Sequence, residues 1–365
     1  MIEVARKRLA FLHMSTTPDR EVFAAILEPL VRRPLGDVGF IGEVVDGVVE
    51  CRLPVLSWPA REQIETELRA AGARDIQVRA MTDPERDELR LVLRGANKGV
   101  LPVTDRKSST RILGISSGKG GVGKSSVTVN LALALQSLGH SVAILDADVY
   151  GFSVPRMLGD VSAPIILGDM VLPTVVHGLR CISMGYFVDD DQPVLWRGPM
   201  LHKAINQLIT EVWWDAPDFL LIDMPPGTGD VALTISEVVP HAEMYVVTTP
   251  QAAAQRVAQR SALAAKKLRL SVRGVIENMG GYVDSSGNLL ELFGAGGGAT
   301  LAADLETPLL GTIPFDVALR HGGDVGAPLM VTDPNAAASR AFRAVAERIA
   351  ALGPTRIYKS ELLVR

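Results

Sequence analysis

Residues 118–125 form the stretch Gly118-Lys119-Gly120-Gly121-Val122-Gly123-Lys124-Ser125. An apolar run, residues 112–116, comes just before it, and a helical pattern over residues 126–138 follows and ends at Gly139. Glycines let a backbone approach phosphate groups closely, because no Cβ stands in the way. The N–H groups at the start of the next helix then point partial positive charge at the anion. A strand, this loop and a helix in that order predict a site for a nucleoside triphosphate, and the spacing is that of the Walker A motif.

The loop residues have separable expected roles. Lys124 would neutralise the β- and γ-phosphate oxygens, and the hydroxyl of Ser125 would bind Mg²⁺. ATP with Mg²⁺ is therefore the expected ligand. The residues expected to contact it are those of the loop and the first residue of the helix, namely Gly118, Lys119, Gly120, Gly121, Val122, Gly123, Lys124, Ser125 and Ser126.

Two further expected strands end in carboxylates. The run SVAILDAD ends in Asp146 and Asp148, and the run FLLID ends in Asp223. Ligands of open parallel sheets gather at the carboxyl ends of the strands. We expect Asp148 to orient the attacking water and Asp146 and Asp223 to support Mg²⁺, although Asp146 could instead cap a helix or a turn. Residues 225–230, PPGTGD, follow as a switch segment whose backbone would respond to the γ-phosphate.

Short apolar runs recur from residue 111 onward and alternate with helical stretches. Runs that are apolar on both faces suit a parallel sheet covered by helices. The expected fold class is α/β, a P-loop NTPase with a mostly parallel sheet covered by helices. The runs are residues 112–116, 142–146, 219–223, 245–248, 274–276 and 309–313.

A small α/β domain is expected before the ATPase domain. Its pattern comprises a helix over residues 20–32, a hairpin over 40–55 that turns at Asp46-Gly47, a helix over 60–71 and a strand over 76–79. Residues 97–110 are polar and turn-rich, which suits a linker. The expected division is residues 1–96 for the small domain, 97–110 for the linker, 111–352 for the ATPase domain and 353–365 for a tail.

The composition limits the possible partners. Of 365 residues, 47% are hydrophobic and 21% are charged, so a large core can be buried. The net charge of −4 offers no general attraction to nucleic acid or to anionic membranes, and no apolar run approaches the roughly 18 residues that span a bilayer. We expect a cytoplasmic protein without nucleic-acid or membrane partners. Its two cysteines, Cys51 and Cys181, are expected to be small buried hydrophobes.

With Lys119 the loop also resembles the deviant Walker A pattern, KGGxGKS, of the class that includes MinD, ParA and nitrogenase iron protein. Residues 111–352 resemble the Mrp/ApbC branch of that class, a family of iron–sulfur cluster carriers. Residues 19–83 resemble, more faintly, the small domain that precedes many Mrp proteins. The matching stretches are GKGGVGKSSVTVNLALAL, LDADVYGFSVPRMLG, WRGPMLHKAINQ, DFLLIDMPPGTGD, TTPQ, GVIENM, FGAGGG and PLLGTIPFD.

The resemblance implies a homodimeric ATPase that binds an iron–sulfur cluster and hands it to apoproteins. Lys119 would reach across the dimer to the nucleotide of the partner, as an arginine finger does elsewhere. It would then be catalytic together with Lys124 and Asp148.

The resemblance also assigns residues outside the loop. Asn278 and the turn that begins at Pro314 would frame the adenine base, and residues 196–200 would lie near the dimer face. The family normally carries a Cys-x-x-Cys after the ENM segment, but residues 280–288 here contain no cysteine. Iron–sulfur clusters need thiolate ligands. The family therefore makes a cluster possible while the sequence supplies no ligands for it, and a cysteine-bearing scaffold subunit becomes a candidate partner beside the apoprotein clients.

Three functions stay open from the sequence. The first is an Mrp-type ATPase that works in iron–sulfur cluster handling. The second is a MinD/ParA-like ATPase switch that positions or recruits a protein cargo. The third is a binding module that has lost turnover, although every lysine and carboxylate that hydrolysis needs is present.

Overall fold

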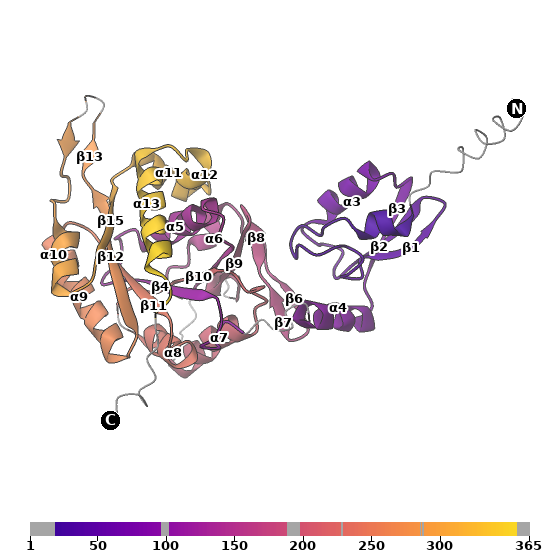
Figure 1. Cartoon of the computed structure of the whole chain (residues 1–365), viewed down its shortest axis with the longest axis horizontal. Coiled ribbons are helices and arrows are strands. Elements are labelled where there is room, and N and C mark those ends of the chain that lie inside the picture. The colour runs from indigo at the N-terminus through magenta and orange to yellow at the C-terminus, as the bar shows by residue number, and fades with distance from the viewer. Residues whose placement is uncertain are drawn as a thin grey trace, which may run out of the picture. The chain divides into compact units, whose positions relative to one another are not determined.

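The computed structural model describes residues 19–95, 102–187, 198–227, 229–284, 286 and 288–355. Two compact units are distinct in it (Figure 1). Residues 19–95, together with 167–169, belong to the small unit, and the other described residues belong to the large one. Part of the expected linker lies outside the described residues, so its bounds stay a prediction.

A three-stranded sheet forms the centre of the small unit, in the order β1 (Ile41–Val45), β2 (Val48–Leu53) and β3 (Asp75–Ala80). Strands β1 and β2 are antiparallel and form the expected hairpin. Asp46 and Gly47 have φ values of 49° and 76°, the left-handed pair that a tight hairpin turn requires. Strand β3 pairs parallel with β2, after the helix α3 (Arg61–Ala70).

The expected helix over residues 20–32 is wrong in its length, because α2 spans only Arg20–Ala24. Glu28 is fully buried, and its carboxylate accepts hydrogen bonds from the backbone N–H of Val31 and the indole N–H of Trp58. Arg32 has a φ of 53°, outside the helical region. A side chain that satisfies the backbone in a turn competes with continuation of the helix.

The sequence patterns did not indicate helix α4 (Asp83–Gly95). Its first turn holds Pro84, which suits a helix start because proline has no N–H to satisfy there. Leu89 and Leu93 are buried one turn apart. The helix is therefore held by one apolar face, in a segment that is otherwise strongly charged.

The large unit is built on an eight-stranded sheet of order β15-β12-β11-β4-β10-β5-β9-β8. All neighbours pair parallel except β8, which is antiparallel to β9 at one edge. All six expected runs are strands of this sheet, which confirms the predicted α/β class. The strands are β4 (Arg111–Ser117), β5 (Val142–Asp146), β8 (Thr174–Val176), β9 (Leu179–Ser183), β10 (Phe219–Asp223), β11 (Glu243–Thr248), β12 (Ser271–Gly280) and β15 (Leu309–Pro314).

Helices cover both faces of this sheet (Figure 1). One face packs against α5 and α13, and the opposite face packs against α7, α8, α9 and α10. Burial on both faces explains why the strands are apolar throughout. The helices of the large unit are α5 (Lys124–Ser137), α6 (Val154–Leu158), the short 3₁₀ helix η1 (Met184–Phe187), α7 (Gly198–Thr210), α8 (Asp230–Val238), α9 (Ala252–Lys267), α10 (Gly297–Asp304), α11 (Val317–Val325), α12 (Leu329–Thr332) and α13 (Ala337–Leu352).

Two short hairpins complete the described elements: β6 (Ile165–Leu167) with β7 (Met170–Leu172), and β13 (Tyr282–Val283) with β14 (Leu289–Leu290).

Strands β4, β10 and β5 lie side by side in the middle of the sheet. In their register Asp223 is opposite both Ile115 and Asp146. The chain leaves β5 and β10 at the same edge at which β4 enters the glycine-rich loop. Three segments far apart in the sequence thus meet at the carboxyl edge of the sheet, where ligands of open α/β sheets bind.

Candidate nucleotide-binding site

The glycine-rich loop forms the bend between β4 and α5. Gly121 and Gly123 have φ values of 81° and 78°, a conformation that side chains with a Cβ rarely adopt. Helix α5 begins at Lys124, directly after Gly123. The start of the helix and the loop amides therefore lie together, as the Walker A interpretation requires.

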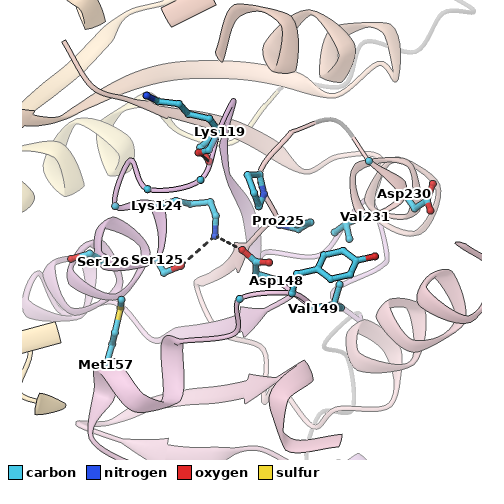
Figure 2. Close-up of a pocket in the computed structure, with 18 of the residues that line it drawn as sticks. Lys119, Lys124, Ser125, Ser126, Asp148, Val149, Met157, Pro225, Asp230 and Val231 are labelled. Atoms are coloured by element: carbon cyan, nitrogen blue, oxygen red, sulfur yellow. Dashed lines mark hydrogen bonds and ion pairs between the residues drawn. The ribbon is translucent and has the colours of Figure 1, made fainter. Parts of the chain in front are cut away.

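A cavity of about 590 Å³ opens beside this loop (Figure 2). It is lined by most of the loop, by residues 148–151 after β5, and by residues of the segment that joins β10 to α8. Of the residues expected to contact nucleotide, Lys119, Gly120, Gly121, Gly123, Lys124, Ser125 and Ser126 line it. The expected carboxylate Asp148 lines it as well.

Lys124 lies at the centre of the site. Its Nζ is 2.8 Å from Oδ2 of Asp223, 3.5 Å from Oδ2 of Asp148 and 3.3 Å from Oγ of Ser125. The hydroxyl of Ser125 donates to the same Asp223 oxygen at 2.5 Å. The fold thus brings together the Walker A lysine, the Walker A hydroxyl and the carboxylate at the end of β10, as the sequence predicts.

These groups fit a magnesium–nucleotide complex. Magnesium takes oxygen ligands, and in nucleotide sites it uses one or two protein oxygens beside phosphate and water. Ser125 and Asp223 present a hydroxyl and a carboxylate side by side, and Lys124 supplies the positive charge for the phosphates. Asp223 contacts both the Lys124 amino group and the Ser125 hydroxyl, the groups that phosphate and Mg²⁺ would use.

Asp148 has the features expected of a residue that handles water. Its side chain is almost fully buried, and its Oδ1 has no hydrogen-bond partner among the described residues. Burial raises the pKa of this carboxyl group above its ordinary value, against the attraction of Lys124. A buried polar atom without a partner is costly, and a bound water or ligand would satisfy it.

Asp146 is fully buried, and both of its carboxylate oxygens accept hydrogen bonds from protein groups. Its Oδ2 accepts from the backbone N–H of Ser153 and Val154 and from the hydroxyl of Ser183, and its Oδ1 accepts from the N–H of Asp148. Burial and the Asp223 carboxylate raise the pKa of Asp146 to about 7. The contacts favour the alternative of a cap at the start of α6, and support of Mg²⁺ through water stays a prediction.

Lys119 extends away from the cavity centre. Figure 2 shows its amino group directed away from Lys124, on the far side of the loop. Among the described residues its Nζ donates one hydrogen bond, a long one of 3.4 Å, to Oε1 of Gln251. The Lys119 side chain would have to change its conformation before its amino group could contact phosphates bound beside Lys124.

The residues expected at the adenine base do not line the cavity. The side-chain amide of Asn278 donates to the carbonyl of Val122 at 2.9 Å and thereby ties β12 to the loop. Pro314 ends β15 and pairs with Gly280. Their role toward adenine stays a prediction. Of the segment 196–200, expected at a dimer face, Trp196 and Arg197 lie outside the described residues.

Thr128 belongs to this site although it is not among the residues predicted from the sequence. Its hydroxyl is fully buried and contacts Oδ1 of Asp223 at 2.7 Å. It follows Lys124 by four positions on α5, so both side chains lie on the same face of the helix. A hydroxyl residue four positions after the lysine was the one indication in the sequence. The sequence could not show that its partner is Asp223, 95 positions away.

Gly118 packs closely against α9, and its contact with phosphate stays a prediction. A Cβ at this position would lie 2.2 Å from the backbone N of Ala258 and 2.3 Å from the carbonyl carbon of Val257, both on α9. We expect Gly118→Ala to lower the free energy of unfolding by about 2–3 kcal/mol, since overpacking against backbone forces a shift. Gly120→Ala is the matched control, because no atom lies within 4 Å of its Cβ position. Equal thermal unfolding midpoints for the two variants, measured without nucleotide, would contradict this assignment.

The two cysteines are buried, as expected. Cys51 is 1% exposed and Cys181 is 0% exposed. Burial raises the pKa of the Cys51 thiol to about 12 and that of Cys181 well above its ordinary value. Thiolate is the form that binds metal. Across the described residues, no group of three or more His, Cys, Asp or Glu side chains is placed to hold a metal ion.

The burial of both cysteines predicts how many thiols react in the native and in the unfolded chain. The native chain should show no rapid reaction with an aromatic disulfide reagent, and the unfolded chain should show two reactive thiols. A thiol of the native chain that reacts within seconds would contradict the burial of both cysteines. The cysteines would then again be candidate ligands of an iron–sulfur cluster.

Comparison with known proteins agrees with this geometry. Residues 108–350 match the family model ParA, described as NUBPL iron-transfer P-loop NTPase. The chain belongs to this family. The iron–sulfur cluster carrier protein of Mycobacterium tuberculosis is 39% identical over 92% of this chain and 94% of its own length. The protein of the same name in Bacillus subtilis is 39% identical over 81% of this chain and 87% of its own length.

Solved structures confirm the fold class of this family member. The nucleotide-binding protein of Archaeoglobus fulgidus in complex with ADP aligns with a TM-score of 0.54 at 29% identity, over 62% of this chain and 90% of its own. MinD of Pyrococcus horikoshii with Mg-ADP aligns with a TM-score of 0.51 at 26% identity, over 67% of this chain and 97% of its own. As a P-loop NTPase of the iron-transfer family, the chain is an ATP hydrolase by class. No helix within the described residues is long and apolar enough to cross a membrane.

Proposed function

We propose that this chain is a dimeric ATPase that takes part in the assembly of iron–sulfur clusters or in their transfer to apoproteins. The observation that carries the proposal is the convergence of Lys124, Ser125 and Asp223 beside a glycine-rich loop. The proposed cargo is inferred from the relatives, because two of them at 39% identity are named iron–sulfur cluster carrier proteins. We expect the chain to act in the cytoplasm.

The proposed reaction follows from the side chains present. Lys124 leaves Asp223 and turns to the β- and γ-phosphate oxygens, while the loop amides hold the phosphate backbone. Bound Mg²⁺ would supply charge neutralisation between these phosphates, with Ser125 and Asp223 beside it. Asp148 orients a water in line with the γ-phosphate through its free oxygen. Lys119 of each copy completes the site of its partner.

The switch segment would couple hydrolysis to the partner. Its described residues Pro225, Pro226 and Gly229 line the cavity, and so does Asp230, the first residue of α8. The N–H of Gly227 donates to the carbonyl of Ser117 at the end of β4. Loss of the γ-phosphate would release this segment, and the dimer would loosen.

The cluster itself would be held with help from outside this chain. Its two thiols are buried in separate units, and among the described residues no group of three or more His, Cys, Asp or Glu side chains is placed to hold a metal ion. We infer that a cysteine-bearing scaffold subunit or the apoprotein client supplies the thiolates. The ATPase would then recruit and release that partner.

The second candidate is a MinD/ParA-like switch that positions a protein cargo. The burial of both cysteines, the residue type that iron–sulfur clusters need, favours it. The two candidates share the same nucleotide chemistry and differ in the cargo.

Anaerobic reconstitution with iron and sulfide separates the candidates. The chain alone should retain no stoichiometric cluster. A mixture with a cysteine-bearing iron–sulfur apoprotein and ATP should transfer cluster faster than the apoprotein with ATP alone. A wild-type chain that hydrolyses ATP but never accelerates transfer would favour the switch.

A further inference from the structure

The Asp223 carboxylate is held from both of its oxygens. Lys124 and Ser125 contact Oδ2, at 2.8 Å and 2.5 Å, and Thr128 contacts Oδ1 at 2.7 Å. Asp223 and Thr128 are both fully buried, so bulk water cannot replace any of these contacts. The carboxylate is therefore oriented entirely by protein groups.

Nucleotide binding would remove the Lys124 contact, because the phosphates need that ammonium group. Ser125 would bind Mg²⁺ through an oxygen lone pair and would keep its O–H on Oδ2 of Asp223. On the other oxygen, Oδ1, the Thr128 hydroxyl is the only side-chain donor among the described residues. A buried carboxylate oxygen that lost its only donor would be costly, and the carboxylate would be free to rotate.

The helix holds Thr128 in the required direction. Its Oγ1 lies 3.0 Å from the carbonyl of Lys124, the residue four positions earlier, which is a preferred arrangement for threonine in a helix. A hydroxyl has only one proton, so it cannot donate to both acceptors. The carboxylate is the closer and the charged acceptor, and it takes the proton.

We propose that Thr128 is the positioning residue of the magnesium site. Its hydroxyl holds Oδ1 of Asp223, so that Oδ2 stays aimed at Ser125 and at the Mg²⁺ position after Lys124 has left. Thr128 touches neither nucleotide nor metal and acts only through Asp223. The inference rests on the proposed nucleotide site and adds a residue outside its motif.

Thr128→Val and Thr128→Ser form the matched pair for the test. Valine keeps the shape and removes the hydroxyl, whereas serine keeps the hydroxyl and removes a methyl group. The full chain would be titrated with a fluorescent ADP analogue, first without Mg²⁺ and then across a range of Mg²⁺ concentrations. Removal of a residue that orients a metal ligand lowers metal affinity by about 10- to 100-fold.

We expect the valine variant to raise the Mg²⁺ concentration at half-saturation by about tenfold, with ADP affinity in the absence of Mg²⁺ unchanged. The serine variant should stay within about twofold of the wild type, because it retains the donor. Thr128→Ala is the second hydroxyl-free variant, in case valine disturbs folding. It should give the same Mg²⁺ shift.

Three outcomes would overturn the proposal. The first is a wild-type Mg²⁺ midpoint in the valine and alanine variants. The second is an equal shift in the serine variant, which would make side-chain volume the cause. The third is an equal loss of ADP affinity with and without Mg²⁺, as expected of a purely structural defect. A wild-type chain that binds no ADP would instead refute the nucleotide site itself.

Discussion

Lys124→Ala is expected to abolish measurable ATP binding. The change removes the only side-chain cation within 4 Å of both Asp148 and Asp223 among the described residues. One hydrogen bond between charged groups contributes about 1.5–3 kcal/mol, and Lys124 would make several with the phosphates. We therefore expect affinity to fall by about 100-fold or more, as measured by calorimetric titration.

The same variant should also be less stable without nucleotide. It leaves two buried carboxylates beside each other without their cation, a change that costs about 3–5 kcal/mol in buried pairs. Circular dichroism must therefore establish that the variant is folded at the titration temperature. Lys203→Ala, at an exposed lysine of α7, is the control and should bind as the wild type does. Wild-type binding by a folded Lys124→Ala variant would refute the site.

Lys119→Ala is expected to separate binding from hydrolysis. The side chain is half-buried and directed away from Lys124, so its loss should leave ATP affinity within about threefold of the wild type. A cation supplied in trans to a γ-phosphate accelerates hydrolysis by about 10³- to 10⁵-fold. We expect the rate of phosphate release to fall by about 1,000-fold. Lys267→Ala, at an exposed lysine on α9, should hydrolyse normally.

Mixing the two variants tests whether Lys119 acts in trans. A Lys119→Ala chain binds ATP but lacks the lysine, and a Lys124→Ala chain carries the lysine but binds no ATP. Random exchange of subunits would place one complete site in half of the dimers. The mixture should then recover about a quarter of the wild-type rate. No recovery, under conditions in which subunits demonstrably exchange, would mean that Lys119 works within its own chain or not at all.

The local pattern of the sequence was sufficient for the fold class and for the centre of the site. The six apolar runs became strands because burial on both faces demands apolar residues along the whole run. The glycine-rich loop became a bend before a helix because Gly121 and Gly123 need positive φ values. Lys124, Ser125 and Asp223 met because the motif and the strand end share one edge of the sheet.

Only the tertiary structure decided what each carboxylate and glycine contacts. Asp146 and Asp148 are two positions apart, yet one has both oxygens occupied by protein donors and the other keeps a free oxygen. Gly118 belongs to the motif, but the backbone of α9 is what leaves no room for a Cβ there. Thr128 lies outside the motif, yet its hydroxyl contacts Asp223. The motif and the strand pattern depend on neighbours within a few positions, which the sequence displays. Contacts between residues about a hundred positions apart depend on how the strands are ordered, and no local pattern encodes that order.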